Sequence, residues 1–307
     1  MFCWDVFRGL SISRSVNIST PHDARGFPED LGAEPAGLLN TATALVLRPL
    51  ALEDEDVNTT DLGSLTAGNA VLPVYFDEGC TVGKVVPRYV VWIDVMGSNS
   101  AMRRSLAMSA NFVMKLHVAA LNASKFSGPD FTFYPMIDGI YCLATDKFRT
   151  LAFLERVFGS LAHVFLEESK NQHRFMIRGA LAYGSIVLGR DLRNGSKSLE
   201  SDADYCERVV LGMPLTQAFD DSRLAAPFGV YVSESARSFG SISTGVHLRW
   251  WCAGIIRDSR LAEVALRLKG ALAEYYKWCK AHPTTLGYEP SAIERHEVLM
   301  NEYFCDV

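Results

Sequence analysis

The sequence lacks the short motifs that mark zinc ribbons, disulfide-rich domains and membrane spans. Its seven cysteines are scattered and never form a Cys-x-x-Cys pair, and its seven histidines never recur at His-x-x-x-His spacing. These absences argue against a zinc ribbon or a disulfide framework and are typical of a reducing compartment. No apolar stretch reaches the ~20 residues of a membrane span, and no basic segment precedes an apolar run at the N-terminus. We therefore expect a cytoplasmic location, with no signal peptide and no membrane span.

An excess of positive charge is also missing. The chain has 30 lysines and arginines against 35 aspartates and glutamates, a net charge of -5. This balance gives no support for a general nucleic-acid-binding face, so nucleic acid is not an expected partner. The sequence is rich in hydrophobic residues, which make up 49% of the 307, while 21% are charged. A large core is therefore available, enough for one large or two modest domains.

Composition divides the chain into three parts. Residues 1–83 contain loop-like stretches and few periodic segments, so we expect a weakly ordered N-terminal extension. Residues 84–240 alternate strand-like and helix-like patterns, which indicates one sheet with helices in an α/β or α+β domain. Residues 241–307 carry apolar side chains at helical spacing and predict a C-terminal helical extension.

The segment Tyr89–Ile93 is a run of aromatic and β-branched residues that predicts a buried strand. It ends at Asp94, where an acid faces a large desolvation cost unless a cation or hydrogen-bond donors compensate it. Gly97 and Ser98 then break the strand and begin a helix, whose first backbone N–H groups can bind an anion. This stretch suits a metal-bound phosphate, and the alternative is that Asp94 only caps the turn.

The helix that begins at Ser98 is expected to run for about six turns, because apolar residues recur every three or four positions as far as Ala120. Arg103 and Arg104 would lie in its first turn, where cations oppose the helix dipole. A bound polyphosphate would reverse that effect. The alternative is that both side chains point into water or pair with an acid.

Residues 131–134 and 140–144 predict a hairpin with Asp138 at its turn, and Pro135 either restricts the first strand to a sheet edge or marks a bulge. An acid at a hairpin tip is usually only turn chemistry. Here, however, a strand–helix–hairpin unit can place Asp138 beside Asp94, which closes the preceding strand. Two carboxylates that converge on one sheet could bridge two divalent metal ions, the arrangement used for phosphoryl transfer.

Four segments resemble, in the same order, the motifs of the class III nucleotide cyclases. They are the first-strand motif at Trp92–Ser98, the hairpin motif at Ile137–Gly139, the next strand at Arg178–Gly184 and the later helix at Gly212–Ala218. The first strand has the aromatic or aliphatic run followed by Asp, and the next strand, Arg-Gly-Ala-Leu-Ala-Tyr-Gly, begins with Arg and ends with Gly as the family's motif does. The resemblance covers roughly residues 84–304.

The departures from the family pattern concern the base and the transition state. Thr216 stands where typical members have an asparagine, and Asp220 where they have the arginine that steadies the transition state. Tyr134 lies near the position of the purine-selecting lysine. A branch with such substitutions is the pyrimidine (uridylate) cyclases of the bacterial Pycsar anti-phage system, and residues 286–304 also resemble the C-terminal helix of that group.

The resemblance implies an α+β fold like that of the class III nucleotidyl cyclases: a ferredoxin-like sheet with flanking helices and a helical C-terminal tail. It implies that the protein converts UTP to 3′,5′-cyclic UMP and pyrophosphate with two Mn²⁺ or Mg²⁺ ions. It further implies a homodimer with shared sites and a separate effector activated by the cyclic nucleotide. The alternatives are a cytidylate cyclase, a purine nucleotide cyclase and a non-catalytic nucleotide-sensing domain.

The same resemblance assigns roles to individual residues. Asp94 and Asp138 would be the catalytic metal ligands, with the Val95 carbonyl completing one metal site. The substrate-binding candidates are the following side chains: Tyr89, Tyr134, Arg103 and Arg178. Either tyrosine could fill the volume of a purine's second ring or be an ordinary core aromatic, and the arginine at 178 could instead form a structural ion pair. Backbone amides of residues 96–98, together with Arg103 or Arg104, are candidates for the triphosphate. The candidates contributed by the partner subunit are Arg178, Glu207 and Arg208.

Overall fold

The computed structural model describes residues 85–307, apart from residues 129, 196, 239, 241, 243–244 and 257. Contacts divide the chain into two units, Met1–Leu65 and Thr66–Val307, and every described residue belongs to the second. The predicted N-terminal extension, residues 1–83, lies outside the described residues. None of the helices in the described part has both the length and the apolar surface that crossing a bilayer would need.

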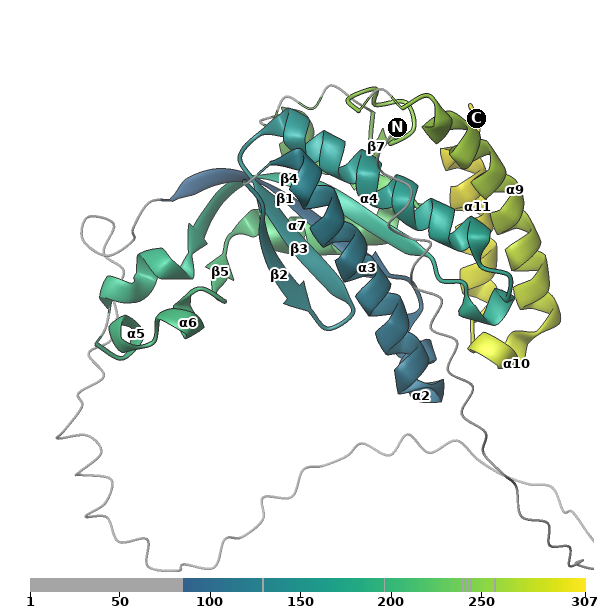
Figure 1. Ribbon diagram of the computed structural model, residues 1–307, viewed down its shortest axis with the longest axis horizontal. Coiled ribbons are helices and arrows are strands. Elements are labelled where there is room, and N and C mark those ends of the chain that lie inside the picture. The colour runs from purple at the N-terminus through teal and green to yellow at the C-terminus, as the bar shows by residue number, and fades with distance from the viewer. Residues whose placement is uncertain are drawn as a thin grey trace, which may run out of the picture. The chain divides into compact units, whose positions relative to one another are not determined.

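Four antiparallel strands form the centre of the described unit (Figure 1). Strand β1 (Val86–Val95) pairs on one side with β3 (Gly139–Ala144) and on the other with β4 (Ile177–Leu188), and β2 (Thr132–Met136) pairs with β3. Helices connect β1 to β2 and β3 to β4, and the sheet order is β2-β3-β1-β4. This is the ferredoxin-like arrangement. Because β2 is the edge strand, the position predicted from Pro135 is confirmed.

Three short strands extend the sheet beyond β4. β6 (Val230–Val232) runs parallel to β4, and β7 (His247–Leu248) pairs antiparallel with β6. β5 (Val210–Leu211) pairs with the last part of β4 and lies outside the strand order β2-β3-β1-β4-β6-β7. The described residues therefore form a mixed seven-stranded sheet.

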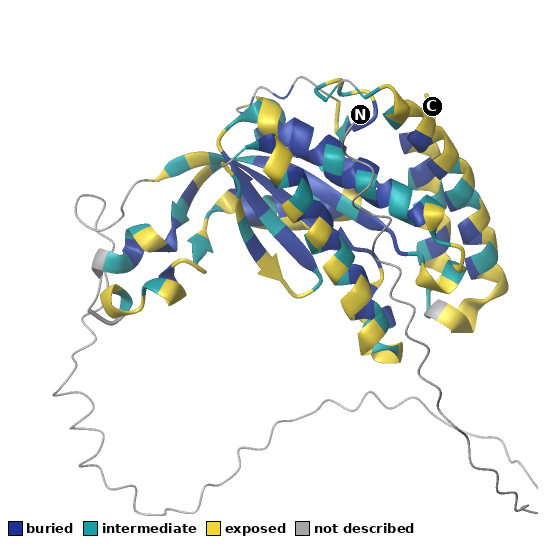
Figure 2. Ribbon diagram, viewed as in Figure 1, coloured by how far each residue is buried: buried dark blue, intermediate teal, exposed yellow. Residues whose placement is uncertain are grey.

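Helices pack on both faces of this sheet (Figure 2). Side chains alternate along a strand, so Ile93 faces the larger core with α3 (Leu106–Ser127) and α4 (Lys147–Glu167), whereas Trp92 faces a smaller core with α7 (Met213–Asp221). The shorter helices are listed here with their bounds: α2 (Ser98–Arg104), α5 (Lys197–Ser201), α6 (Ala203–Cys206), α8 (Glu234–Ser238) and α10 (Pro283–Leu286). Helices of the 3-10 type occur at these positions: Asn171–His173, Gly189–Gly195 and Ser222–Leu224.

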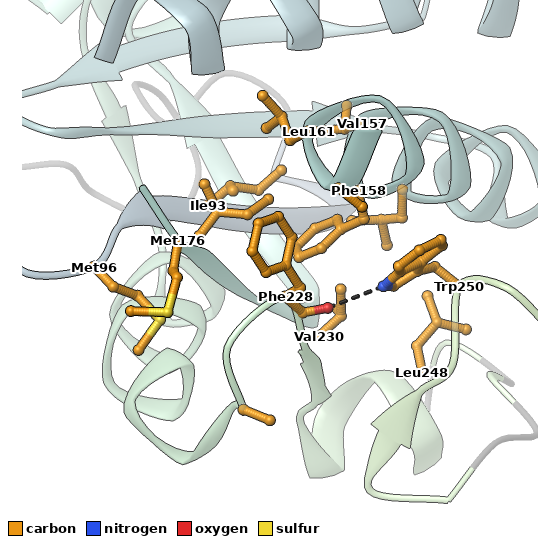
Figure 3. Close-up of a cluster of buried hydrophobic side chains, with 14 of the residues drawn as sticks. Ile93, Met96, Val157, Phe158, Leu161, Met176, Phe228, Val230, Leu248 and Trp250 are labelled. Atoms are coloured by element: carbon orange, nitrogen blue, oxygen red, sulfur yellow. Dashed lines mark hydrogen bonds between the residues drawn. The ribbon is translucent and has the colours of Figure 1, made fainter. Parts of the chain in front are cut away.

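The C-terminal helices share the larger core. α9 (Arg260–Ala281) packs against α4, and α11 (Pro290–Tyr303) packs against α9. The Trp250 indole N–H donates to the Phe228 carbonyl at 2.9 Å, which ties the segment before α9 to the sheet (Figure 3). The predicted α+β class, flanking helices and helical tail are confirmed. The domain boundary between residues 240 and 241 stays a prediction, and both sides of it contribute to one hydrophobic core.

The single helix predicted from Ser98 is wrong, because the chain breaks at Ser105. Extended backbone there separates α2 from α3, and the Ser105 hydroxyl accepts a hydrogen bond from a backbone N–H in the first turn of α3 at 3.2 Å. A residue that caps one helix in this way cannot continue the previous one. Arg103 and Arg104 therefore lie in the last turn of α2, where cations favour the helix dipole instead of opposing it.

Candidate active site at the end of strand β1

Two aspartates meet where β1 ends beside the β2–β3 hairpin. Asp94 lies directly opposite Gly139 in the β1–β3 pairing, so Asp138 in the hairpin turn is its diagonal neighbour. The Val95 N–H donates to the Asp138 carbonyl oxygen at 3.2 Å, which holds the hairpin turn against the strand end. The structure therefore brings together the two acids that the sequence places on separate elements.

Arg178 approaches this pair from the other side of β1. It lies directly opposite Asp94 in the β1–β4 pairing, and its Nε is 3.2 Å from Oδ1 while its Nη2 is 3.3 Å from Oδ2. A bidentate arginine–carboxylate pair fixes geometry as well as supplying charge. The ion pair that the sequence left open for Arg178 is thus formed, and its partner is one of the candidate catalytic acids.

The ionised form of the Asp94 carboxyl is disfavoured by burial. Asp94 is 9% exposed, and burial raises the pKa of its carboxyl above the usual value. The Arg178 guanidinium and its hydrogen bonds lower this pKa, whereas the nearby charge of Asp138 raises it again. The Arg178 guanidinium therefore pairs with Asp94, while the second carboxylate, Asp138, adds negative charge nearby. A further cation between them would relieve both the desolvation cost and the mutual repulsion.

The oxygen atoms of this group suit a divalent metal ion. Carboxylate and carbonyl oxygens are the ligands that Mg²⁺ and Mn²⁺ prefer, and Asp94, Asp138 and the Val95 carbonyl offer both kinds. The described residues contain no group of three or more His, Cys, Asp or Glu side chains that could hold a metal ion. At phosphoryl-transfer sites, Mg²⁺ is usually bound through one or two carboxylates, with water and substrate phosphates as the other ligands. The residues present therefore fit metal ions that bind together with a phosphorylated substrate.

Ser98 contributes more than the sequence predicts. Only its backbone amide is an expected ligand contact, whereas its hydroxyl donates a hydrogen bond to an Asp138 carboxylate oxygen. Gly97, with a φ of 73°, turns the chain from β1 into α2 and brings Ser98 to the hairpin. The Met96 backbone amide, also expected to bind the triphosphate, is not free to do so, because its N–H donates to the Met176 carbonyl at 2.8 Å.

Tyr134 lies on the same face of the sheet as Asp94. Tyr134 on β2 pairs with Tyr141 on β3, and Tyr141 pairs with Trp92 on β1. Trp92 in turn precedes Asp94 by two residues on β1. Directly paired residues, and residues two apart on one strand, point to the same face. The Tyr134 ring is buried, and the cavity beside it has a volume of about 10 Å³, room for one water molecule. A base could reach this ring only after neighbouring side chains move.

Tyr89 lies on the opposite face, because it precedes Asp94 by five positions on the same strand, an odd spacing, and side chains alternate between the faces. Its ring packs against that of Tyr183 with the centroids 4.7 Å apart, and its hydroxyl donates to the Gly240 carbonyl at 2.6 Å. Tyr89 is thus placed as a core aromatic, the alternative that the sequence left open. The structure does not bring it to the two acids.

The arginines that end α2 have different surroundings. A Cβ atom at Gly287 would lie 3.2 Å from Nε and Nη2 of Arg104, so the Arg104 guanidinium lies against the chain between α10 and α11. Arg103 is exposed, and its contact with substrate stays a prediction. Neither arginine forms an ion pair with another residue in the described part of the chain.

Of the comparisons with known proteins, only the one with solved structures gives matches. No protein-family model matches the chain, and no curated protein matches it significantly. One similar structure is the monomeric guanylyl cyclase domain of the RhoGC fusion protein from the aquatic fungus Blastocladiella emersonii, at 14% identity, with 52% of this chain and 89% of that chain covered and a TM-score of 0.39. Others are the adenylyl cyclase CyaB from P. aeruginosa (10% identity, 51% and 81% covered, TM-score 0.37) and a bacterial light-regulated adenylyl cyclase (8% identity, 60% and 99% covered, TM-score 0.41). At such low identities and TM-scores, the function has to be argued from the side chains of the site.

Proposed function

We propose that this chain is a nucleotide cyclase that converts UTP to 3′,5′-cyclic UMP and pyrophosphate. The observation that carries the proposal is the group formed by Asp94, Asp138 and Arg178, in which two adjacent carboxylates meet a bidentate guanidinium at one end of the sheet. Metal-binding carboxylates with a cation beside them are what the transfer of a phosphoryl group requires. The four segments that resemble class III cyclase motifs support the same assignment.

In the proposed reaction, the ribose 3′-oxygen attacks the α-phosphorus of UTP. The new bond joins phosphorus to the 3′-oxygen, the bond from phosphorus to the bridging oxygen breaks, and pyrophosphate leaves with the electron pair. The proton of the 3′-hydroxyl passes to solvent. Divalent ions bound by Asp94, Asp138 and the Val95 carbonyl would lower the pKa of that hydroxyl and neutralise charge on the phosphates. Arg178 has five N–H donors, more than Asp94 uses, so it is placed to bind a phosphate oxygen as well.

Tyr134 supports the choice of a pyrimidine base. It lies on the face of Asp94, near the position of the purine-selecting lysine in typical members, and its ring occupies volume that a purine would need. The alternatives are a cytidylate cyclase, a purine nucleotide cyclase and a nucleotide-sensing domain without catalysis. Thr216 and Asp220, exposed on α7 where typical cyclases have asparagine and arginine, favour the last of these.

The biological context is proposed from the resemblance to the Pycsar cyclases. It consists of anti-phage defence in the cytoplasm, with cyclic UMP activating a separate effector. A homodimer with shared sites belongs to the same proposal. Ile137, beside Asp138 at the hairpin tip, is 88% exposed and has a φ of 37°, which is unusual for a β-branched residue. An exposed apolar side chain on a strained backbone next to the acids supports a subunit contact at this point.

Mixing two inactive variants is expected to restore activity if the sites are shared. Asp94→Asn chains lack an acid, and Arg208→Gln chains lack a candidate group that the partner would contribute. When subunits exchange, half of the dimers are mixed and each holds one intact site, so about one quarter of parental activity should return. No restoration, in mixtures shown by labelled chains to exchange subunits, would argue against shared sites.

Removal of metal ions is the experiment that tests the proposed chemistry. Pyrophosphate release from UTP is expected to stop in EDTA and to return with Mn²⁺ or Mg²⁺, because Asp94 and Asp138 alone cannot neutralise the phosphates. A coupled pyrophosphate assay at increasing metal concentration measures this dependence. Turnover that persists without metal would contradict the proposed role of the two aspartates.

A further inference from the structure

Helix α3 has apolar side chains on both of its faces. The face toward the sheet carries Phe112 and Leu116, which are buried in the larger core. The opposite face carries Met114, Val118 and Leu121, which are between 40% and 57% exposed. Exposed positions follow one another along the whole length of this helix (Figure 2). A helix that is apolar all round is normally buried, so we expect a partner to cover the outer face of α3.

Six exposed positions of α3 repeat at the spacing of a coiled coil. They recur after four and three residues in alternation and are called the α3 seam here: Ala107, Asn111, Met114, Val118, Leu121 and Lys125. A heptad repeat of this kind packs against another helix, because each seam side chain enters a hole between four residues of the facing helix. The spacing of the seam therefore indicates that the partner is a helix.

The residues of the seam favour two identical helices in parallel. Val118 occupies heptad position a and Leu121 the next position d, and a β-branched residue at a with leucine at d favours a parallel two-stranded coil. Asn111 occupies another position a, where a single asparagine fixes the register of such a pair at a cost in stability. In a parallel pair each seam residue faces its own copy, so the two asparagine side chains can hydrogen-bond to each other.

The charges of α3 also select the parallel direction. The helix contains no acid, so its cations have no compensation within it. In a parallel pair Lys115 faces an alanine of the second copy, and its ammonium group turns away from the seam to lie 5.9 Å from the centre of the Phe175 ring. An antiparallel pair would instead bring Lys125 close to Arg103 and Arg104 at the start of the other helix, where like charges repel.

The area of this surface determines how strong the association can be. The seam is about 27 Å long and about 10 Å wide, or roughly 270 Å², whereas each partner of a stable complex buries roughly 800 Å². The β2–β3 hairpin enlarges the surface, because His117 Nε2 lies 3.4 Å from a carbonyl oxygen at the start of β3, and Met136 and Ile137 near the hairpin tip are exposed. The seam is thus continuous with the tip at which a subunit contact is already proposed. An interface of this size gives a weak, concentration-dependent complex.

We propose that α3 pairs with α3 of a second copy of this chain to form a parallel two-stranded coil. The helix covers the sheet face to which Ile93 points, whereas the Asp94 carboxyl points to the other face. Pairing through α3 therefore leaves the two acids uncovered. It is an interface distinct from that of a homodimer with shared sites, and it joins such dimers to one another. The proposal does not depend on the reaction that the protein catalyses.

Val118→Glu is expected to weaken self-association of the full chain by at least about tenfold, because parallel pairing then buries two facing carboxylates in an apolar seam. Sedimentation velocity at about 1 to about 100 µM chain measures the dissociation constant in the range expected for a weak complex. Val118 is 40% exposed, so the replacement leaves the core intact. Val298→Glu is the matched control, since Val298 is 56% exposed on α11, and it should change the dissociation constant by less than about twofold.

A mixture of Val118→Glu and Val118→Lys chains tests the direction of pairing. Each variant alone should associate weakly, because like charges face each other across the seam. The mixture should recover a dissociation constant within about threefold of the parental value, since residue 118 faces its own copy only in a parallel pair. A mixture that associates as weakly as the separate variants would overturn the parallel pair.

Asn111→Val provides a change in the opposite direction. It removes the polar side chain from the seam and should strengthen self-association about tenfold, because asparagine at this position costs stability. Self-association that is the same in the parental, Val118→Glu and Asn111→Val chains would overturn pairing through α3. These measurements contain no nucleotide, so their outcome is independent of the proposed function, which fails only when the parental chain forms no cyclic product.

Discussion

Asp94→Asn and Asp138→Asn are each expected to lower kcat by at least about a thousandfold, which corresponds to about 4 kcal/mol of lost transition-state stabilisation. An amide keeps the shape of the side chain and loses the charge that binds metal ions. Pyrophosphate release from UTP measures the rate. Asp204→Asn, which removes an exposed acid on α6, is the matched control and should keep the parental rate. Near-parental turnover and metal dependence in either site variant would show that the two-metal assignment is wrong.

Asp94→Asn is also expected to leave the melting temperature unchanged or to raise it. Burial raises the pKa of the Asp94 carboxyl in the folded chain, so the free energy of unfolding falls as pH rises from the unfolded-state pKa to the folded-state pKa and stays lower above it. Near pH 7 the ionised carboxylate therefore costs stability, and the amide removes that cost. A clear fall in the melting temperature would show that the ion pair with Arg178 outweighs the cost of burial.

Tyr134→Ala is expected to reduce the preference for UTP over ATP, a preference that should be about tenfold to a hundredfold in the parental protein. The Tyr134 ring occupies volume on the face of Asp94, and its removal makes room for a purine. The ratio of kcat/KM for UTP to that for ATP is the quantity to measure, because it does not depend on the fraction of folded protein. ATP or GTP as the best substrate of the parental chain would contradict the pyrimidine assignment.

Tyr89→Ala provides the matched control for that ratio. Tyr89 is equally buried and lies on the opposite face of the sheet, so its loss should leave base preference unchanged. It should lower stability by about 3–5 kcal/mol, as the loss of a large buried aromatic does. Equal falls of the ratio in both variants would assign the effect to lost packing instead of to a base pocket.

The sheet could be predicted from the sequence because its signals are local. The aromatic and β-branched run Tyr89–Ile93 defines the strand β1, and Pro135 places β2 at an edge. The opposite faces of Tyr89 and Asp94 also follow from their odd spacing and could have been predicted. The helix after Gly97 could not be divided in the same way, because apolar periodicity continues across Ser105 while the capping hydroxyl decides the break.

The surroundings of the two acids depend on contacts that are distant in sequence. Asp94 faces Arg178 only because β1 and β4 pair in one particular register, and register is set by the packing of the whole sheet. The approach of Arg104 to Gly287 likewise depends on how the C-terminal helices pack. The sequence therefore named the two acids and the candidate arginines, and tertiary structure was needed to show that Arg178 pairs with Asp94 and that Arg104 lies against Gly287.

The product formed from UTP is the most direct test of the nucleotide cyclase assignment. The full chain is incubated with UTP and Mn²⁺, and the products are separated and identified by mass spectrometry against authentic 3′,5′-cyclic UMP. The expected result is 3′,5′-cyclic UMP and pyrophosphate in equal amounts from the parental chain, and neither from Asp94→Asn. Formation of UMP or UDP without a cyclic product, or an unchanged pool of UTP, would contradict it.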